Sequence, residues 1–292
     1  MALPNFFCVG TQKAATTTLH DILKQHPDIY LPVSKEPWFF HRDEKYRKGL
    51  AWYENEYFSG YNNEKIVGEI TPEYMYFEKV PGRIFKELGP DILFLFVLRN
   101  PVDRAYSHYL MTCRRGFETL SFEKAVKFEH ARINSGFREK IHYSYLSRGR
   151  YCEQIERYVN FFSKKNMMFL IFEEDIVLKI EESINRILLF LDVEEIKLDC
   201  NIQSNPATMP KIKLFRDLIY TPNFLRRIMK LFVPSSDLRS KIRNMLDMLN
   251  QRPHQSPELD TVIRRQILEK YFKEDIKKLE EIIQKDLTCW YA

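Results

Sequence analysis

Near the start of the chain, an apolar run ends at a glycine and is followed by a lysine and three threonines. These residues are Phe6 to Gly10, Lys13, Thr16, Thr17 and Thr18. Glycine has the conformational freedom that lets the backbone turn there, and the free N–H groups of the helix that follows point at an anion. The lysine adds a mobile positive charge, and the threonine hydroxyls add hydrogen-bond donors. The stretch therefore predicts a loop that binds a phosphate group.

The spacing of this loop differs from that of a Walker A motif. Walker A sequences place the lysine directly before the serine or threonine, whereas Ala14 and Ala15 separate Lys13 from Thr16. The difference argues against an ordinary ATPase or GTPase. The simpler alternative is a plain strand–turn–helix with a surface lysine and a threonine as the helix N-cap.

A second pattern that could bind a phosphate begins with the apolar residues 92–98. They predict a strand of a parallel sheet whose side chains are buried on both faces. Arg99 follows at the carboxyl end, where ligands bind in open α/β sheets, and Pro101 suits the first turn of a helix. Ser107 lies about two turns along that helix, so Arg99 and Ser107 could hold one phosphate from two sides. In the alternative, Arg99 pairs with Asp103 and Ser107 only packs.

Two predicted phosphate sites indicate a nucleotide that carries phosphate at both ends. Together the two motifs resemble those of the sulfotransferases that use 3′-phosphoadenosine 5′-phosphosulfate (PAPS), most closely the glycan sulfotransferases of heparan type and their bacterial relatives. Further segments, in family order, are similar to Lys-Glu-x-x-Phe-Phe, Glu-Lys-Thr-Pro-x-Tyr, Gly-x-Tyr and Asp-Leu-x-x-Trp. They are Lys35–Phe40, Glu69–Tyr74, Gly149–Tyr151 and Asp286–Trp290.

This resemblance implies a P-loop-like fold and roles for the motif residues. Thr16, Thr17 and Thr18 would hold the 5′-phosphate, and Lys13 would bind the bridging oxygen as negative charge develops on the leaving phosphate. Arg99 and Ser107 would hold the 3′-phosphate, so the product 3′,5′-adenosine bisphosphate (PAP) should inhibit strongly.

Two more residues are assigned to the nucleotide through the resemblance. Tyr151 would lie against the nucleotide. Arg252 precedes Pro253 where family members carry a basic loop over the 3′-phosphate, although the Lys-Gly-Arg form of that loop is missing here.

Sulfuryl transfer also requires a base for the acceptor's proton. Glu69 ends a predicted strand, at the position that we assign to the catalytic glutamate of the glycan branch. His41 is the alternative, because the cytosolic small-molecule branch uses a histidine and that side chain titrates near neutral pH. We expect Glu69 to be the base, and we expect Lys35 at the rim of the active site, near the donor sulfate or the acceptor.

Alternating strands and helices should position these residues. Apolar runs predict strands near 5–10, 28–32, 65–70, 92–99 and 167–173. Helical periodicity predicts helices near 15–26, 80–89, 101–116, 121–135, 151–163 and 180–192, and one long stretch over 256–285. This order is typical of an α/β fold of three layers, a central parallel sheet flanked by helices, here with a helical C-terminal region. Because no linker composition interrupts the chain, we expect a single domain over residues 1–292.

Residues 210–250 carry more basic than acidic side chains, with apolar residues between them. The simpler interpretation of 210–250 is a pair of amphipathic helices with a solvated basic face. The alternative is an insertion or lid over 200–250 on the acceptor side, with peripheral membrane contact through 210–243.

Composition adds several expectations. The net charge of +5 suits a polyanionic donor without requiring nucleic acid as a partner. The 5 cysteines and 7 histidines lack metal-ligand spacing, so we expect neither a metal nor a disulfide framework. No secretory leader or membrane-spanning run is recognisable, which favours a cytoplasmic and bacterial protein.

Other functions and the identity of the acceptor stay open at this stage. A P-loop-like nucleotide kinase is one alternative, although strand 92–98 is followed by an arginine instead of a magnesium-binding aspartate. A non-catalytic nucleotide-binding module is another. The acceptor could be a glycan, a lipid or a small molecule with a hydroxyl or amine. Aromatic residues could line its site or belong to the core: Trp38, Trp52, Tyr53, Tyr74 and Tyr76.

Overall fold

The structure is a computed structural model that describes residues 2–202, 208–210, 242, 245–246, 249–253 and 257–291. The chain divides into two compact units. The first comprises Met1–Arg104, Ser147–Asn205 and Thr261–Ala292, and the second comprises Ala105–Leu146 and Pro206–Asp260. The expectation of a single domain stays a prediction. Nearly all of the predicted insertion at 200–250 lies outside the described residues.

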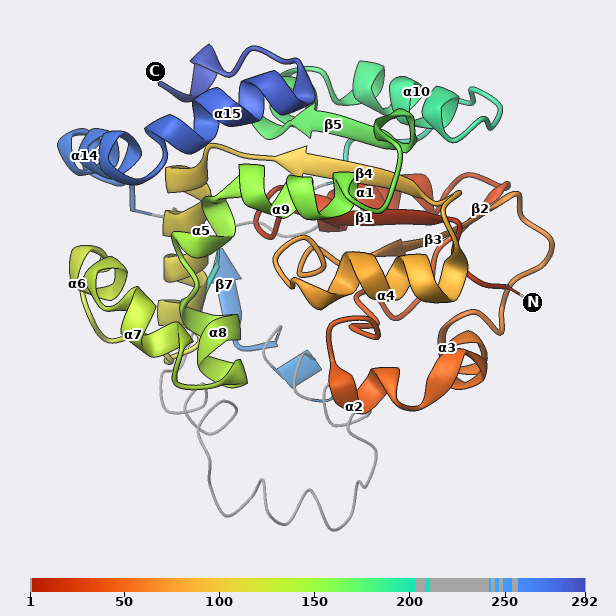
Figure 1. Cartoon of the computed structure of the whole chain (residues 1–292), viewed down its shortest axis with the longest axis horizontal. Coiled ribbons are helices and arrows are strands. Elements are labelled where there is room, and N and C mark those ends of the chain that lie inside the picture. The colour runs from red at the N-terminus through yellow and green to blue at the C-terminus, as the bar shows by residue number, and fades with distance from the viewer. Residues whose placement is uncertain are drawn as a thin grey trace, which may run out of the picture. The chain divides into compact units, whose positions relative to one another are not determined.

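The first unit contains a sheet of five parallel strands in the order β2-β3-β1-β4-β5 (Figure 1). The strands are β1 (Phe6–Gly10), β2 (Ile29–Tyr30), β3 (Ile66–Ile70), β4 (Leu93–Leu98) and β5 (Met167–Ile171). Each falls within a predicted strand range. The predicted fold class, a central parallel sheet flanked by helices, is confirmed.

The helices of the first unit mostly follow the predicted ranges. They are α1 (Thr16–Leu23), α2 (Asp43–Tyr46), α3 (Gly49–Tyr57), α4 (Lys79–Leu88), the start of α5 (Pro101–Arg114), α9 (Tyr151–Val159), α10 (Ile180–Phe190), α14 (Thr261–Tyr271) and α15 (Lys273–Ile283). The short helices α2 and α3 were not predicted. The continuous helix predicted over 256–285 is instead two helices, which separate at the buried Phe272.

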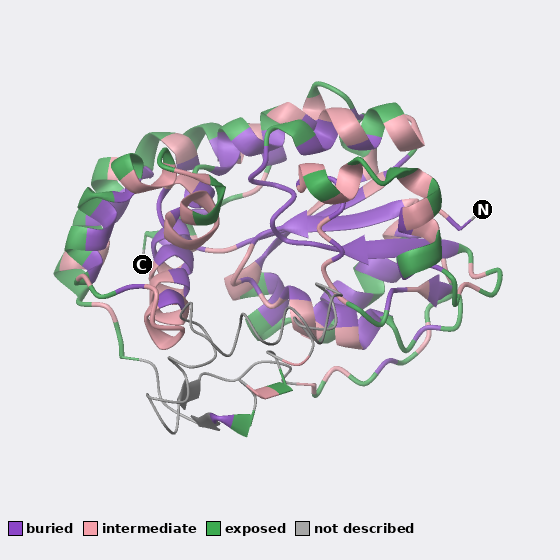
Figure 2. Ribbon diagram, turned by 90° about the horizontal axis from the view of Figure 1, so that it is seen from below, coloured by how far each residue is buried: buried purple, intermediate pink, exposed green. Residues whose placement is uncertain are grey.

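The two faces of the sheet differ in character because alternate side chains of a strand point to opposite sides. On one face, aliphatic strand residues pack against α1 and α10; they include Cys8, Leu95, Val97 and Leu170. On the other face the side chains are aromatic: Phe7 stacks on Phe94, and Tyr158 of α9 packs edge-on against Phe94 and Phe96. Figure 2 shows the resulting pattern, with buried strands and with helices whose outer sides are exposed.

A ligand is expected at the carboxyl ends of the neighbouring strands β1 and β4. The chain crosses from β3 over β1 to β4, so the strand order reverses between β1 and β4. Open α/β sheets bind ligands outside the carboxyl ends of their strands at such a point. The N–H of Thr11 donates to the carbonyl oxygen of Val97 at 2.8 Å, which brings the end of β1 level with the end of β4.

Asn100 fixes the chain where it leaves β4. Its Oδ1 accepts hydrogen bonds from the N–H groups of Val102 (2.9 Å) and Asp103 (3.2 Å), so it caps α5. Its Nδ2 donates to the carbonyl oxygen of Trp290 at 2.8 Å. Glu173 completes the network by accepting from the Asn100 N–H and the Trp290 Nε1. The segments that follow β4 and β5 and the C-terminal region are thus tied together beside Arg99.

The second unit contains the rest of α5, the helices α6 (Phe122–Lys127), α7 (Glu129–Ile133) and α8 (Phe137–Tyr143), and an antiparallel pair, β6 (Thr208–Pro210) with β7 (Gln251–Pro253). The helix predicted over 121–135 is therefore two short helices. The buried Glu118 carboxylate accepts from Arg132 (2.6 Å) and Tyr145 (2.8 Å) and links the loop before α6 to α7 and to the segment after α8.

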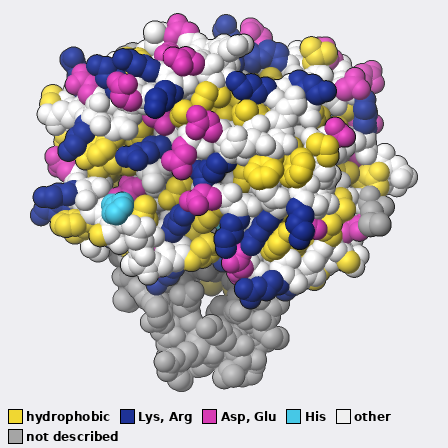
Figure 3. Space-filling model, viewed as in Figure 1, with side chains coloured by type: hydrophobic (Ala, Val, Ile, Leu, Met, Phe, Trp, Pro, Cys, Tyr) yellow, Lys and Arg dark blue, Asp and Glu magenta, His cyan; other side chains and the backbone are white. Residues whose placement is uncertain are grey.

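Charged side chains of both signs are interspersed on the face shown in Figure 3. Within the part of the chain that the structure describes, no helix is both long and apolar enough to span a bilayer.

Replacing Asn100 with alanine should destabilise the fold by about 2 kcal/mol or more, because the change removes a helix cap and a buried hydrogen bond. The free energy of unfolding in urea measures the effect. Asn160 is an exposed C-cap residue of α9, and its alanine variant should stay within about 0.5 kcal/mol of the wild type. Equal losses in both variants would contradict the role of Asn100.

Candidate functional site

The loop between β1 and α1 leaves the start of the helix without a side-chain cap. Lys13 and Ala15 have positive φ angles of 77° and 57°, and Ala15, the N-cap residue of α1, makes no side-chain cap hydrogen bond. The first N–H groups of α1 therefore lack the side-chain partner that usually satisfies them, which is the geometry that suits an anion. The alternative of a threonine N-cap is not observed.

Gly10 is required for a reason that differs from the predicted one. We expected it to supply conformational freedom for a turn, but its φ angle is not positive and it is the last residue of β1. A Cβ atom at this position would lie 2.6 Å from the Sδ of Met75. Glycine is therefore needed because Met75 packs directly against the strand end.

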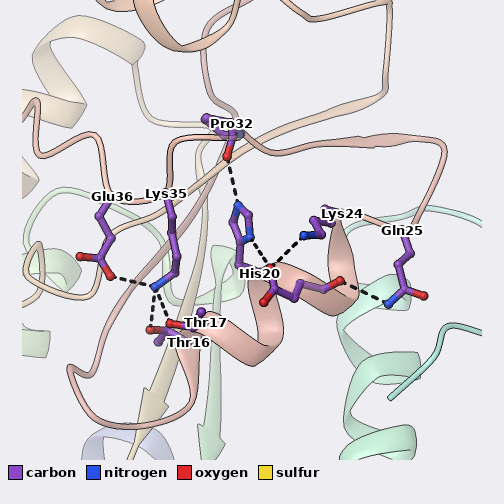
Figure 4. Close-up of polar contacts among 9 residues, drawn as sticks. Thr16, Thr17, His20, Lys24, Gln25, Pro32, Lys35 and Glu36 are labelled. Carbon is purple, nitrogen blue, oxygen red and sulfur yellow. Dashed lines mark hydrogen bonds and ion pairs between the residues drawn. The ribbon is translucent and has the colours of Figure 1, made fainter. Parts of the chain in front are cut away.

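Lys35 reaches the start of α1 from the segment that follows β2. Its Nζ donates to the Thr17 Oγ1 at 3.1 Å and is 3.5 Å from the Thr16 Oγ1 (Figure 4). It also forms a 2.8 Å ion pair with Glu36, whose side chain is 27% exposed. Thr18 follows on α1 and is half-buried. The structure thus brings Lys35 together with Thr16 and Thr17, and it adds Glu36, which the sequence analysis did not single out.

Arg99 lies on the other side of the same loop. Its Nη1 donates to the carbonyl oxygen of Lys13 at 2.8 Å, and its guanidinium lies 4.6 Å from the ring centre of Phe172. Its Nε is buried without a hydrogen-bond partner among the described residues. The alternative pair with Asp103 does not form, since Asp103 binds Arg264 through two hydrogen bonds of 3.0 and 3.2 Å.

Tyr151 contacts the main chain of this site from the buried side. It is fully buried, and its hydroxyl donates to the carbonyl oxygen of Arg99 at 2.8 Å. With no exposed surface, Tyr151 supports the main chain of Arg99 in this structure; the expected contact with a nucleotide stays a prediction.

Ser107 and Arg252 belong to the second compact unit. Ser107 is half-buried on α5, and the main chain of Arg252 pairs with Met209 between β7 and β6. The phosphate contacts expected of Ser107, with Arg99, and of Arg252 stay predictions. The basic residues between 211 and 241 lie outside the described residues.

Glu69, the expected base, is fully buried on β3. Its Oε1 accepts from the Thr71 hydroxyl at 2.5 Å, and its Oε2 accepts from the Tyr53 hydroxyl. Burial raises the pKa of this carboxyl from 4.5 to about 7. The structure encloses Glu69 among core aromatic residues and does not present its carboxylate to an acceptor, so its role as a base stays a prediction that the geometry does not favour.

His41 is also enclosed. Its ring stacks on Phe77 with 4.7 Å between the ring centres, and the residue is 5% exposed. Burial, followed by the positive charge of Arg42 and other nearby cations, lowers the pKa of His41 to about 2. An imidazole with such a pKa is a very weak base at neutral pH, so the geometry does not favour His41 either.

Gln12 and Glu73 form a contact at the loop that the sequence analysis missed. The Gln12 Nε2 donates to the Glu73 Oε1 at 3.2 Å. Burial, and then the negative charge of Glu36, raise the pKa of Glu73. No sequence signal indicated Glu73, because it occupies the variable position x of the segment similar to Glu-Lys-Thr-Pro-x-Tyr.

Several aromatic residues considered for an acceptor site belong to the core. Tyr53 and Tyr74 are fully buried, and Tyr53 stacks on Phe39 with 4.3 Å between the ring centres. Tyr76 is 8% exposed. Trp38 and Trp52 are half-buried. In the described part of the chain, no group of three or more His, Cys, Asp and Glu side chains is arranged to hold a metal ion.

Comparisons with known proteins place the chain in a protein family. Residues 3–205 match the model of the sulfotransferase domain family. The chain is 35% identical over 132 residues to the membrane-associated sulfotransferase kil1 of Dictyostelium discoideum, covering 44% of this chain and 27% of that protein. It is 32% identical over 168 residues to mouse heparan sulfate glucosamine 3-O-sulfotransferase 3B1, covering 58% and 41%. The chain thus matches well under half the length of these curated relatives.

A solved structure is similar over the whole chain. The crystal structure of a sulfotransferase from Alicyclobacillus acidocaldarius has a TM-score of 0.70 and 27% sequence identity, and the similarity covers 100% of both chains.

The raised pKa of Glu69 should make stability depend on pH. Between about 4.5 and 7 the folded protein binds a proton at Glu69 that the unfolded chain has lost, so its contribution to stability is present below pH 4.5 and is lost as the pH rises to 7. The Glu69→Gln variant should lack this part of the decline, which amounts to about 1–3 kcal/mol. Urea unfolding at pH 5, 6, 7 and 8 measures the difference between the two proteins. Parallel pH profiles would show that Glu69 titrates normally.

Proposed function

The chain belongs to the sulfotransferase domain family, and on that premise we propose that it transfers a sulfuryl group from PAPS to a hydroxyl or amine of an acceptor. One observation carries the proposal. Arg99 donates to the Lys13 carbonyl while Lys35 donates to Thr17, so residues from both predicted phosphate sites meet at the loop after β1. A nucleotide kinase is the weaker alternative because the loop lacks the Walker A order.

The residues at this loop suit a phosphate-bearing donor. The uncapped start of α1, the Lys35 ammonium and the partnerless Nε of Arg99 all supply hydrogen-bond donors. PAPS would supply an activated sulfuryl group on its 5′-phosphate. In the proposed reaction, the bond between sulfur and the bridging phosphate oxygen breaks while a bond to the acceptor oxygen or nitrogen forms. Lys13 and Lys35 would stabilise the negative charge that the departing phosphate gains.

The acceptor's proton must pass to a base, and we propose Glu36 for this role in preference to Glu69 and His41. The Glu36 carboxylate is adjacent to Lys35, which itself contacts the loop, and its side chain keeps 27% of its surface exposed. A base must lie within hydrogen-bond reach of the proton that it accepts. The accessible surface of Glu36 leaves its carboxylate open to an approaching acceptor, whereas Glu69 and His41 are enclosed.

For the acceptor, we propose a chemical class and not a single compound. A glycan is favoured by the similarity to a heparan sulfate glucosamine 3-O-sulfotransferase; a lipid or a small alcohol would use the same chemistry. The cytoplasmic location, the bacterial origin and membrane contact through 210–243 stay predictions.

The donor site is tested by calorimetric titration with PAP, ATP and 5′-AMP. The wild type should bind PAP selectively, and Arg99→Ala should weaken PAP binding by about tenfold or more, as expected for the loss of a charge-assisted hydrogen bond. Arg265→Ala is the matched control, because Arg265 is exposed on α14 and pairs only along its helix with Glu269 in the contacts described. Equal binding of all three nucleotides would refute the proposed donor.

The base assignment is tested by comparing Glu36→Gln with Glu69→Gln. With PAPS and a panel of sugar and alcohol acceptors, Glu36→Gln should lower kcat by about 10²–10⁴-fold, the usual contribution of general acid–base catalysis. PAP affinity should change little. The assignment fails if Glu69→Gln lowers kcat more than Glu36→Gln does in folded protein.

A further inference from the structure

A buried histidine on α1 contacts the segment that carries Lys35 and Glu36. His20 is 6% exposed, and its Nε2 lies 3.1 Å from the carbonyl oxygen of Pro32 (Figure 4). A carbonyl oxygen can only accept, so Nε2 must carry a proton and donate in this contact. His20 is thus a hydrogen bond away from a main-chain atom located three residues before Lys35.

Asp21 lies at the other ring nitrogen of His20, and Lys24 in turn contacts Asp21. The His20 Nδ1 lies 3.2 Å from the Asp21 Oδ1, and the same oxygen accepts from the Lys24 Nζ at 3.0 Å. The carboxylate also only accepts. A neutral ring with its proton on Nε2 keeps the Pro32 contact, and a doubly protonated ring keeps both contacts. In either form His20 is oriented toward Pro32.

The segment after Pro32 has a backbone that needs such support. Glu36 and Trp38 have positive φ angles of 60° and 59°, which are uncommon for residues other than glycine. Val33 packs on nothing, since it is 99% exposed. Backbone of this kind persists only where surrounding contacts hold it.

Hydrogen bonds with α1 hold this segment at two places. At one place is the His20–Pro32 hydrogen bond, and at the other is the Lys35–Thr17 hydrogen bond of 3.1 Å. Both start from α1, the helix whose first residues form the candidate phosphate site. The segment is therefore fixed on the same helix at two places, one turn apart along α1.

We propose that His20 is a positioning residue, which acts through the Pro32 carbonyl to hold Lys35 and Glu36 at the phosphate loop. His20 touches neither substrate in this scheme. The functional consequence rests on the proposed sulfotransferase activity. If Lys35 is held near the 5′ end of the donor, loss of His20 should weaken the binding of PAPS more than that of PAP, because only PAPS carries the sulfuryl group.

His26 provides a matched control. It is 2% exposed, and its Nε2 lies 2.8 Å from the carbonyl oxygen of Glu194. It follows the same helix and makes the same kind of buried contact, but it holds a different segment. His20→Ala and His26→Ala each remove a buried hydrogen bond from Nε2 to a main-chain carbonyl oxygen, and His26→Ala also removes the acceptor of the Asp28 N–H at 3.0 Å. Only His20→Ala removes a contact with residues 31–40. His20→Gln is a second variant that retains an N–H donor.

The first measurement is amide hydrogen exchange of the peptide that covers residues 31–40, without nucleotide. His20→Ala should speed its exchange by about tenfold or more, in line with the loss of a buried hydrogen bond. His20→Gln should have a smaller effect, and His26→Ala should leave this peptide unchanged. Unchanged exchange in folded His20→Ala, or an equal rise in His26→Ala, would overturn the proposal.

The second measurement is the ratio of PAPS to PAP affinity by calorimetry. The ratio should fall in His20→Ala toward the value of Lys35→Ala, with partial rescue in His20→Gln and no change in His26→Ala. A ratio unchanged in His20→Ala would overturn the link to Lys35. If no variant and no wild-type protein binds PAP, the sulfotransferase proposal fails, while the exchange measurement still decides the role of His20.

Discussion

The parallel pairing of β1 with β4 is the constraint on which the rest of the candidate site depends. Because the two strands run side by side in the same direction, their carboxyl ends meet at one edge, and the Thr11 N–H bonds to the Val97 carbonyl there. The loop before α1 and Arg99 then emerge beside each other although they are far apart in the sequence. The 2.8 Å hydrogen bond from Arg99 to the Lys13 carbonyl follows from this pairing.

Buried residues beneath the edge keep Arg99 in place. Tyr151 binds the carbonyl of Arg99, and Asn100 is held by Glu173 and by the carbonyl of Trp290. These partners are almost completely enclosed or lie at strand ends, so they restrict the main chain while the guanidinium stays half-buried. Preorganisation of this kind lowers the cost of placing charged groups around an anion. The polar atoms of the support network thus serve the site without lying in it.

Local patterns predicted the strands and the loop residues because apolar runs, a glycine and flanking hydroxyl groups lie close together in the sequence. The contact of His20 with Pro32 could not be predicted in this way, since only the folded chain brings α1 to this segment. The Lys35–Thr17 hydrogen bond, which brings Lys35 and the adjacent Glu36 to the loop, arises in the same way. Glu69 shows the opposite case. Its motif position predicts a base, and that role stays a prediction. Its enclosure involves Tyr53 of α3, a helix that the sequence analysis did not predict.

The contacts of Trp290 have a consequence for the order in which the protein can be built. The tryptophan is fully buried and lies 190 positions after Asn100, to which its carbonyl is bonded. Every strand of the central sheet has left the ribosome long before this residue is made. During synthesis the sheet can assemble first, but the support beside Arg99 stays incomplete until Trp290 has been made. The edge of the sheet at Arg99 therefore acquires its final rigidity only after that step.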